Sequence, residues 1–429
     1  MKLSVYHDKT LIGSLEAAPA RLSFCYAPEF LAANPYPISL SLPLQKAPFS
    51  AQATERFFDG LLPEEDERRR MARYLHVPAA STSKLLSALA GDCVGNLTIL
   101  SSDHDFEQLL SQSNYQPLAP TEFQAIIGES PALITQLSAE NRLSIPGAQS
   151  KIGLYHKPGA PPVDCDGWCV PQGLFASTHI VKPDSRFYPL TSLNEYLCTR
   201  LAQAVGIATA EVFLINNQAS AQGKGRDQAV LVSERFDRAC NESGFVTRIC
   251  QEDFCQALSY SSRYKYEADG GPGFAEIIAV LRSEPSNPPL DVQRFIQLFL
   301  FNYLIGNSDA HAKNYSLQRD TAGRLCLAPA YDLVSTTFYP ELSRNLAMGV
   351  AGCYDLDQIT QKHWQALCEQ NQLSWSRLHE IATEIAEGVT DALDNGKITA
   401  PIQNFDEEFT ALSHHLRTEI QSRKQTLIA

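Results

Sequence analysis

The sequence predicts an α+β protein of two lobes, and three observations support this class. Strand-like segments predominate up to about residue 240, whereas helical spacing predominates from Asp253 to the C-terminus. Runs of strands followed by runs of helices are typical of α+β folds. The chain has 429 residues, of which 44% are apolar, so two or three domains with a sizeable core are expected. A cleft between a β-rich lobe and a helical lobe is the predicted place of the functional site.

Residues 1–105 are predicted to form a small N-terminal α+β subdomain. Strands are expected at 2–6, 12–15 and 21–27, where residues that favour β structure surround short turns. Residues 35–44 alternate polar and apolar side chains but include prolines, so an edge strand or an extended segment is predicted. Helical spacing at 57–75, acidic first and basic later, predicts a solvated helix.

Residues 106–240 are predicted to form a β-rich second part. The polar stretch 101–120 is interpreted as a linker. Thr121 has Gln124 three residues later, which matches a capping box and predicts the start of a helix. A further helix is expected at 193–205. Strands are predicted at 151–156, 167–170, 179–182, 211–215 and 229–234.

Residues 241–429 are predicted to form an all-helical C-terminal lobe, because apolar residues recur there at helical spacing. The most apolar segment, Phe295–Gly306, is shorter than the roughly 20 residues that cross a bilayer, so no membrane span is predicted. The helices are expected at 253–260, 272–282, 290–306, 360–372, 375–395 and 406–427.

The charge balance restricts the partners that the protein is expected to have. The chain has 35 Lys and Arg against 48 Asp and Glu, a net charge of −13. This argues against a surface that wraps DNA or an anionic membrane directly. Because the charged residues Asp8 and Lys9 interrupt the N-terminus, no signal peptide is predicted, and a cytoplasmic location is expected.

The run LIGNSDAHAKNYSLQ, followed by LAPAYDLVS, carries the strongest indication of chemistry. Asp309 and Asn314 have the spacing of a kinase catalytic loop, where the Asp orients the attacking hydroxyl and the Asn holds a metal ion. Asp332 follows where a kinase has its second metal-binding Asp. Amide and carboxylate oxygens suit Mg²⁺. The alternative is a helix end, a turn and an Asx-turn that only shape the backbone.

Other segments suit the binding of ATP. Lys182 ends an apolar strand, and Glu195 lies on the first turn of the following helix, which is the arrangement that orients a phosphate-binding Lys. Gly147 in SIPGAQSK allows backbone N–H groups to approach phosphate oxygens, although a hairpin turn explains it equally well. In LVSERFDR, residues 234–236 lie where a hinge between lobes would bind adenine, and core packing is the alternative for Phe236.

Taken together, these motifs resemble the HipA-type toxin kinases. The resemblance rests on SIPGAQSK, HIVKP, NEY, ERFDR, QEDFCQ, KYEADGGPG, IGNSDAHAKN and the YD of PAYDLVS, which occur in this order. The opening VYHDKTLIGSL, with YAPEFL and FFDGLLPEEDERR, is similar to the N-terminal subdomain of that family. The resemblance therefore covers the whole chain and implies a two-lobed protein-kinase or phosphatidylinositol-kinase-like fold.

The resemblance also implies an activity and a set of partners. The protein would be a non-specific serine/threonine protein kinase, and the toxin of a type II toxin–antitoxin pair. A HipB-like helix-turn-helix antitoxin dimer would inhibit it, and the two together would bind operator DNA through the antitoxin and repress their operon. Glutamyl-tRNA synthetase is a substrate in the family, so an aminoacyl-tRNA synthetase is the expected target, with arrest of translation and persistence as the outcome.

By the same resemblance, the site residues take family roles. Asp309 would be catalytic, Asn314 and Asp332 would hold Mg²⁺, and Glu195 would orient Lys182. Ser144 would be the autophosphorylation site that switches the kinase off, and Ser150 stands where some relatives have an acidic residue. The residues assigned to ATP are Pro146, Gly147, Ala148, Gln149, Ser150, Lys151, Lys182, Glu234, Arg235, Phe236, His311 and Tyr331.

Two other functions remain open from the sequence. The Asp-x-x-x-x-Asn spacing does not identify the acceptor, so a small-molecule or lipid kinase of the same fold is one alternative. A transcriptional corepressor with a vestigial kinase pocket is the other. Because Lys182, Asp309, Asn314 and Asp332 are all present, the sequence favours an active kinase.

Overall fold

The protein is described by a computed structural model that divides into two compact units. The first unit contains Met1–Pro183 and Ala219–Ser262, and the second contains Asp184–Gln218 and Arg263–Ala429. Each unit is therefore built from two separate stretches of chain. The predicted division into three parts stays a prediction. The structure describes all residues except 19–20, 34, 129–130, 148, 160, 186, 218–227, 242–243, 245, 321, 397, 399–404 and 429.

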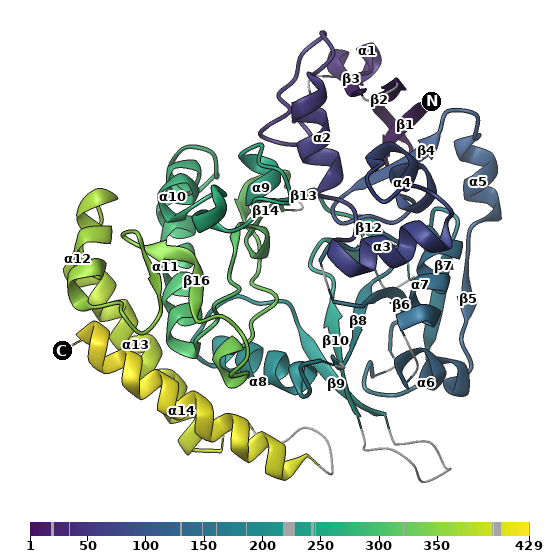
Figure 1. Cartoon of the computed structure of the whole chain (residues 1–429). Coiled ribbons are helices and arrows are strands. Elements are labelled where there is room, and N and C mark those ends of the chain that lie inside the picture. The colour runs from purple at the N-terminus through teal and green to yellow at the C-terminus, as the bar shows by residue number, and fades with distance from the viewer. Residues whose placement is uncertain are drawn as a thin grey trace. The chain divides into compact units, whose positions relative to one another are not determined.

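The N-terminal part of the first unit is an antiparallel sheet with the strand order β3-β2-β1-β4 (Figure 1). Alternate residues, such as Leu3 and Val5, are fully buried, which explains the pattern in the sequence. The rings of Phe24 and Phe58 lie 5.4 Å apart where helix α2 packs on β3. The elements are β1 (Lys2–His7), β2 (Thr10–Ala18), β3 (Arg21–Tyr26), α1 (Pro28–Ala32), α2 (Ala51–Asp59), α3 (Glu65–Tyr74), α4 (Thr82–Leu89) and β4 (Leu97–Ser101).

One prediction for this part is wrong, and another holds in only one of its two forms. The helix predicted at 57–75 is interrupted at residues 60–64, where the chain leaves α2 before α3 begins. Of the two forms predicted for residues 35–44, the edge strand is absent apart from a single bridge between Ser39 and Leu42, whereas the extended segment is not contradicted. The reason is the Tyr26 hydroxyl, which donates to the Leu42 carbonyl at 2.6 Å and accepts the Ile38 N–H at 3.1 Å, so that the segment is held as a loop.

A second antiparallel sheet of the first unit has the order β5-β7-β6-β8-β10. All five residues of β6 are buried, as expected for a strand in the middle of a covered sheet. Phe123 of helix α6 stacks on Trp168 of β7 at 5.0 Å. The elements are α5 (Phe106–Gln112), β5 (Asn114–Pro117), α6 (Pro120–Gly128), α7 (Pro131–Glu140), β6 (Ile152–His156), β7 (Trp168–Gln172), β8 (His179–Pro183) and β10 (Gln228–Glu234).

The linker predicted at 101–120 is wrong, because this stretch contains α5 and the edge strand β5. The predicted capping role of Thr121 is also wrong. Helix α6 already begins at Pro120, and the Glu122 carboxylate accepts the Ala119 N–H at 2.7 Å. The first unit ends with short elements: β11 (Arg238–Cys240), β12 (Val246–Arg248), β13 (Gln251–Asp253) and α9 (Phe254–Ala257).

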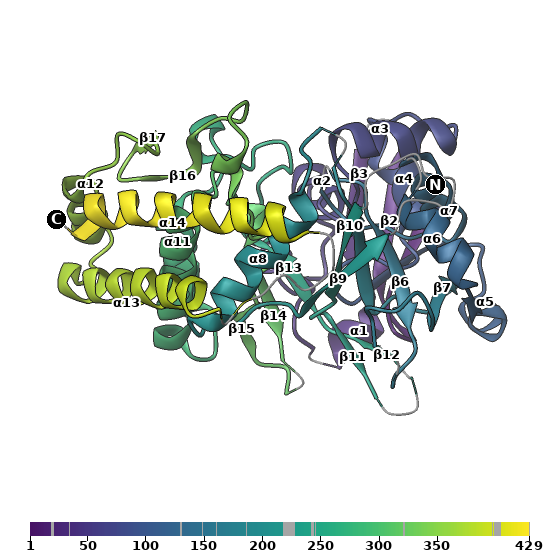
Figure 2. The same ribbon diagram turned by 90° about the horizontal axis from the view of Figure 1, so that it is seen from below.

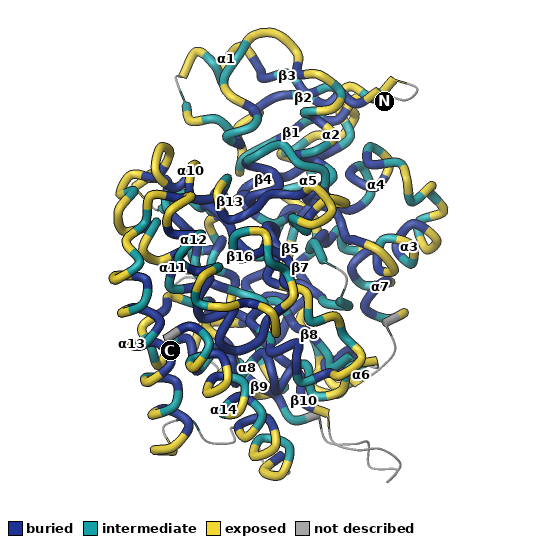
Figure 3. Tube along the Cα trace, turned by 60° about the vertical axis from the view of Figure 1, so that its left-hand side comes forward, coloured by how far each residue is buried: buried dark blue, intermediate teal, exposed yellow. Residues whose placement is uncertain are grey.

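Helix α11 is the core of the second unit, and every residue from Leu298 to Ile305 is buried. Helices α10, α13 and α14 pack on α11, and α13 lies alongside α14 (Figures 1 and 2). On α13 and α14, exposed residues recur at regular intervals, as expected for outer helices (Figure 3). The helices are α8 (Thr191–Ala204), α10 (Phe274–Ser283), α11 (Pro288–Ile305), α12 (Gln361–Gln370), α13 (Trp375–Asp394) and α14 (Asp406–Ile428).

The prediction of an all-helical C-terminal lobe is wrong. Two hairpins, β14–β15 and β16–β17, lie between α11 and α12. Leu317, Leu325 and Leu327 are buried on β14 and β15, so apolar residues recur there with period two. No helix in the described ranges is long and apolar enough to cross a membrane. The strands of this unit are β9 (Val212–Asn217), β14 (Ser316–Arg319), β15 (Leu325–Leu327), β16 (Asn345–Val350) and β17 (Cys353–Asp355).

Candidate active site

The loop that carries Asp309 begins where helix α11 ends. Gly306 ends the helix with φ +71°, and its carbonyl accepts the N–H groups of Thr336 and Thr337 at 3.1 and 3.3 Å. A Cβ atom on Gly306 would lie 2.4 Å from Thr337 Oγ1. Glycine is therefore required at this turn, both for its backbone angle and for space. The turn directs the chain out of the core and into residues 307–314.

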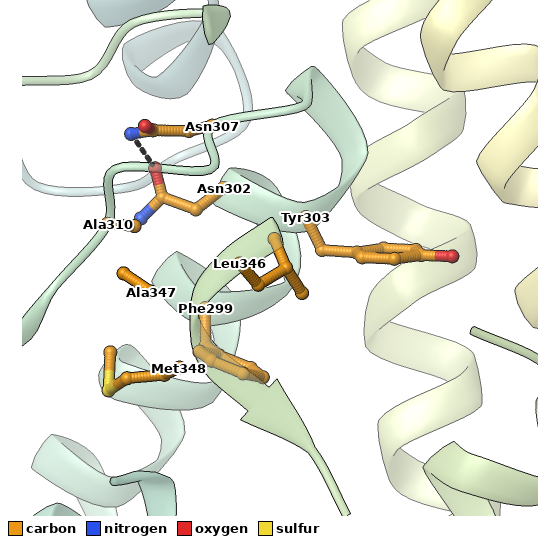
Figure 4. A pocket seen from close by; sticks show the side chains of 8 residues that line it. All are labelled: Phe299, Asn302, Tyr303, Asn307, Ala310, Leu346, Ala347 and Met348. Carbon is orange, nitrogen blue, oxygen red and sulfur yellow. Dashed lines mark hydrogen bonds between the residues drawn. The ribbon is translucent and has the colours of Figure 1, made fainter. Parts of the chain in front are cut away.

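A chain of buried hydrogen bonds anchors this loop to the core. The Asp309 N–H donates to Asn307 Oδ1 at 3.1 Å. Asn307 Nδ2 in turn donates to Asn302 Oδ1 at 2.9 Å (Figure 4). Asn302 Nδ2 then donates to the Tyr315 hydroxyl at 3.0 Å. Beside these amides lies a small cavity lined mostly by apolar side chains, among them Met348 (Figure 4). The amide chain therefore supports the backbone on which Asp309 stands.

The structure brings together the three residues predicted to carry the chemistry. Asn314 Nδ2 donates to the Asp309 carbonyl at 2.9 Å. Asn307 Nδ2 also lies 3.5 Å from the Asp332 carbonyl. The Tyr331 hydroxyl donates to the carbonyl of Lys313 at 2.7 Å and thereby ties the segment before Asp332 to the residue before Asn314. Asp309, Asn314 and Asp332 thus share one hydrogen-bonded loop system in the second unit.

The Asp309 carboxylate is held by a residue that the sequence did not single out. Tyr266 Oη donates to Asp309 Oδ1 at 2.5 Å. The Tyr266 ring packs edge-on against the His311 ring, with centroids 5.4 Å apart, and His311 Nε2 lies 4.0 Å from Asp309 Oδ1. His311 is buried, but the Asp309 side chain is 54% exposed. The Tyr266 hydroxyl therefore orients the Asp309 carboxylate, and the carboxylate remains accessible to a substrate hydroxyl.

The donor set beside Asp309 suits a hard divalent cation. The hydrogen bond from Asn314 Nδ2 fixes the amide so that its oxygen faces away from the Asp309 carbonyl. Asp332 has φ +54°, an uncommon conformation for a residue other than glycine, which is typical of functional sites. No group of three or more His, Cys, Asp or Glu within the described ranges could hold a metal ion by itself. A bound Mg²⁺ would therefore take its remaining ligands from phosphates and water.

Helix α8 carries the predicted orienting residue, Glu195. Asp184 caps the helix by accepting the N–H groups of Leu190 and Ser192 at 2.7 and 3.0 Å. Glu195 is buried in the second turn of the helix, not in the first turn as predicted. The neighbouring Asn194 exchanges two hydrogen bonds with the Ser335 backbone, at 2.9 and 3.0 Å. These bonds fix the position of α8 relative to the segment that follows Asp332.

The predicted phosphate loop lies in the first unit, and Ala148 lies outside the described residues. Gly147 has φ +110°, which only glycine adopts readily, and its carbonyl accepts the Glu64 N–H at 3.3 Å. Pro146 is partly exposed. Ser144 is completely buried, and its hydroxyl donates to the Leu61 carbonyl at 2.6 Å. The loop is thus bound to the segment that joins α2 and α3.

The loop also lies next to the strand that carries Lys182. Lys151 directly precedes β6, and the first residue of β6, Ile152, pairs with Val181 of β8. Lys151 and Lys182 therefore stand at the same end of two neighbouring strands. Gln149 Nε2 donates to the carbonyl of Pro183, the residue after Lys182, at 3.3 Å. The two cationic residues and the glycine turn form one group within the first unit, and Lys182 is buried.

The predicted hinge follows strand β10. Glu234 pairs with His179 of β8, the Glu234 side chain is exposed and Phe236 is partly buried. Arg235 differs from its neighbours, because its side chain is only 1% exposed and its N–H donates to the Thr178 carbonyl at 2.9 Å. The Arg235 side chain is thus occupied inside the protein. Arg235 is therefore no longer expected to contact adenine, and that expectation remains for Glu234 and Phe236 only.

Arg235 belongs to a buried ion cluster that sequence reasoning missed. Asp92 lies 3.4 Å from Arg235, 2.8 Å from Arg238 and 3.4 Å from Arg248, and Asp237 lies 2.7 Å from Arg235. Burial alone would raise the pKa of the Asp92 carboxyl. The three guanidinium groups outweigh burial and hold the pKa of Asp92 well below its usual range. The Asp92 carbonyl also accepts the Ser144 N–H at 3.1 Å, so the cluster and the phosphate loop share a residue.

Comparison with known proteins gives a consistent result. A model of the HipA-like C-terminal domain matches residues 143–393, and a model of the HipA N-terminal domain matches residues 3–100. Y4mE of Sinorhizobium fredii is 35% identical over 397 residues, which cover 91% of this chain and 90% of Y4mE. The serine/threonine-protein kinase toxin HipA of Shewanella oneidensis is 29% identical over 403 residues, which cover 90% of this chain and 87% of that toxin.

A solved structure agrees with the sequence comparisons. It is the complex of HipA and HipB of Shewanella oneidensis MR-1 with operator DNA, and one of its chains superimposes with a TM-score of 0.81 at 26% identity. The match covers 99% of this chain and 98% of that chain. The similarity therefore extends over both the N-terminal subdomain and the loops that carry the proposed chemistry.

Proposed function

The chain belongs to the HipA family of kinases, and from this membership we propose that it transfers the γ-phosphoryl group of ATP to a serine hydroxyl of another protein. The observation that carries the proposal is the hydrogen-bonded loop system that holds Asp309, Asn314 and Asp332 together. Their spacing and residue types are those of a phosphoryl-transfer site.

Each residue of the site has a proposed task. Asp309 accepts the proton of the substrate hydroxyl and directs its oxygen toward the phosphorus atom. Asn314 and Asp332 hold Mg²⁺, which neutralises charge on the phosphates. Lys182 binds phosphate oxygens and is oriented by Glu195. Catalysis thus rests on positioning and on charge stabilisation rather than on a covalent intermediate.

The remaining nucleotide contacts come from two segments. Pro146–Lys151 covers the phosphates, and Glu234 with Phe236 binds the adenine. His311 and Tyr331 complete the site mainly by holding the catalytic loop, because His311 packs on Tyr266 and the Tyr331 hydroxyl bonds the Lys313 carbonyl.

We further propose that the protein is the toxin of a type II toxin–antitoxin module. The support is its full-length similarity to a HipA that is seen with HipB and operator DNA. A HipB-like antitoxin dimer is the proposed inhibitor, and DNA is reached through that dimer because the net charge here is −13. An aminoacyl-tRNA synthetase, such as the glutamyl enzyme, is the proposed substrate, so that phosphorylation stops translation and leads to persistence.

Ser144 is the proposed site of self-inactivation. Its hydroxyl is fully buried and bonded to the Leu61 carbonyl, so it can be modified only after the loop leaves this place. A phosphate dianion at this fully buried position would lose its hydration, which is costly for a charged group. Phosphorylation of Ser144 should therefore keep the loop away from the position that binds ATP.

Three proteins test the proposed function: the parent, Asp309→Asn and Ser144→Ala. After incubation with ATP and Mg²⁺, intact mass should show one added phosphoryl group on the parent and none on Ser144→Ala. Asp309→Asn should bind ATP with the affinity of the parent in calorimetry but should lose nearly all transfer. Phosphoproteomics of cells that express the parent or Asp309→Asn should then reveal the substrate. Self-phosphorylation of Asp309→Asn at the parental rate would show that the catalytic assignment is wrong.

A further inference from the structure

Glu67 of helix α3 is a buried carboxylate that the proposed chemistry does not use. Its side chain is only 6% exposed, and both of its oxygens accept hydrogen bonds. Glu67 Oε2 accepts the Ser150 hydroxyl at 2.9 Å and also pairs with Arg70 one turn later on the helix. Glu67 Oε1 accepts the Thr135 hydroxyl of helix α7 at 3.1 Å. One carboxylate thus joins α3, α7 and the phosphate loop.

The contact with Ser150 is the side-chain part of a longer junction. On the N-terminal side of α3, the Glu64 N–H donates to the Gly147 carbonyl, and residues 63 and 147 form a parallel bridge. Arg70 Nη2 lies 3.5 Å from Ser150 Oγ. Glu67 and Lys151 line the same small cavity beside the loop. The loop is therefore fixed at Gly147 by backbone bonds and at Ser150 by the Glu67 carboxylate.

We propose that Glu67 is a positioning residue of the kinase, which holds the phosphate loop through Ser150 in the conformation that binds ATP. This inference rests on the proposed function. A loop with preorganised N–H groups binds phosphates without a prior ordering cost. If only a fraction of the molecules has the loop in place, the apparent affinity for ATP falls by that fraction. Glu67 should therefore affect the binding of ATP and leave the transfer step unchanged.

The substitution Glu67→Gln tests the proposal with little change in shape. The glutamine amide keeps one acceptor oxygen but places an NH₂ group against the Ser150 or the Thr135 hydroxyl. One of these two hydrogen bonds is therefore lost. Because a hydrogen bond to a charged group is lost, the Kd for a non-hydrolysable ATP analogue with Mg²⁺ should rise by about five- to tenfold. KM for ATP should rise equally, while kcat at saturating ATP stays at the parental value. Hydrogen exchange in residues 143–152 should become faster without nucleotide.

Two matched variants separate positioning from general stability. Ser150→Ala should also raise the Kd, and adding Glu67→Gln to Ser150→Ala should cause no further increase in Kd. Asp66→Asn is the control on the same helix, because Asp66 is exposed and pairs only with Arg69 among the ion pairs of the described residues. It should match the parent in Kd, kcat and exchange.

The outcomes that would overturn the proposal are distinct from those that would overturn the kinase function. Parental Kd and parental exchange in Glu67→Gln, even with a lower melting temperature, would show that Glu67 is only structural. Additive effects of Glu67→Gln and Ser150→Ala on Kd would likewise contradict the path through Ser150. If the parent itself binds no ATP, the kinase function fails, and the exchange of residues 143–152 alone decides whether Glu67 positions the loop.

Discussion

At the residue scale, one hydroxyl group orients the proposed catalytic carboxylate. Tyr266 Oη donates to Asp309 Oδ1 at 2.5 Å, which leaves the second carboxylate oxygen to accept from a substrate hydroxyl. Removal of this bond lets the carboxylate rotate out of line, and errors of orientation are costly in a reaction that depends on positioning. In the proposed mechanism, Tyr266 therefore positions Asp309 without touching the reacting atoms.

The substitution Tyr266→Phe should lower kcat by roughly tenfold, the value of a lost hydrogen bond to a charged group. KM for ATP should not change, because Asp309 is not a nucleotide ligand in the proposed mechanism. Steady-state transfer to the identified substrate measures both constants. Tyr264→Phe is the matched control, since Tyr264 is 54% exposed two residues away. A Tyr266→Phe enzyme with parental kcat would contradict the orienting role.

Spacing predicted Asp309, Asn314 and Asp332, because kinase loops place these residue types at short, fixed distances along the chain. Tyr266 is 43 positions from Asp309 and Glu67 is 83 positions from Ser150, so no spacing rule relates them. Their contacts depend on tertiary packing. Asn307 could have been recognised from the sequence as a residue that anchors the loop, because it is an amide directly after the end of an apolar helix.

At the element scale, the turn after α11 determines where the catalytic loop starts. An alanine at Gly306 would strain the backbone and place Cβ 2.4 Å from Thr337 Oγ1. Gly306→Ala should lower the free energy of unfolding by about 1–3 kcal/mol and should also reduce kcat. Urea unfolding and transfer assays measure the two effects. Gly352→Ala is the control, because Gly352 has φ +83° but open space around its Cβ. It should lose some stability and keep kcat.

Long helices were predicted well, as were strands β6, β8 and β10, whereas several other short elements were not. Helices α12, α13 and α14 lie within three residues of their predicted bounds, because several turns of helical spacing outweigh local ambiguity. The interruption at 60–64 was missed because both flanking segments share the same spacing. The hairpin β16–β17 was missed because its strands, of six and three residues, offer too few alternations to be recognised.

At the scale of the whole molecule, the buried ion cluster links stability to pH. The pKa values of Asp92 and Asp237 are lowered because nearby arginines outweigh the effect of burial. A carboxyl whose pKa is lower in the folded state stabilises that state above its unfolded pKa of about 4, and this stabilisation is lost as pH falls further. The protein should therefore become less stable through this cluster below about pH 4.

The substitution Asp92→Asn should cost about 3–5 kcal/mol at pH 7, because it leaves buried arginines without their partner. The difference in free energy of unfolding between the parent and Asp92→Asn should shrink as pH falls from 5 to 3. Denaturant unfolding across this range measures it, with Glu16→Gln, at an exposed ion pair, as a control that should change stability by less than about 1 kcal/mol. A difference that stays constant with pH would contradict the proposed origin of the stability.

The first unit is built from two separate stretches of chain, and this affects how it can fold during translation. Asp92 emerges 156 positions before Arg248, and the stretch 184–218 that belongs to the other unit must be translated in between. The nascent chain cannot complete the buried ion cluster until Arg248, residue 248 of 429, has been made, although domains usually fold as they emerge. A polypeptide that stops between residues 144 and 235 would contain Glu67 and Ser144 but would lack the arginines that pair with Asp92. Such a fragment would leave the Asp92 carboxylate without its guanidinium partners, so we expect the first unit to fold only after the chain has passed Arg248.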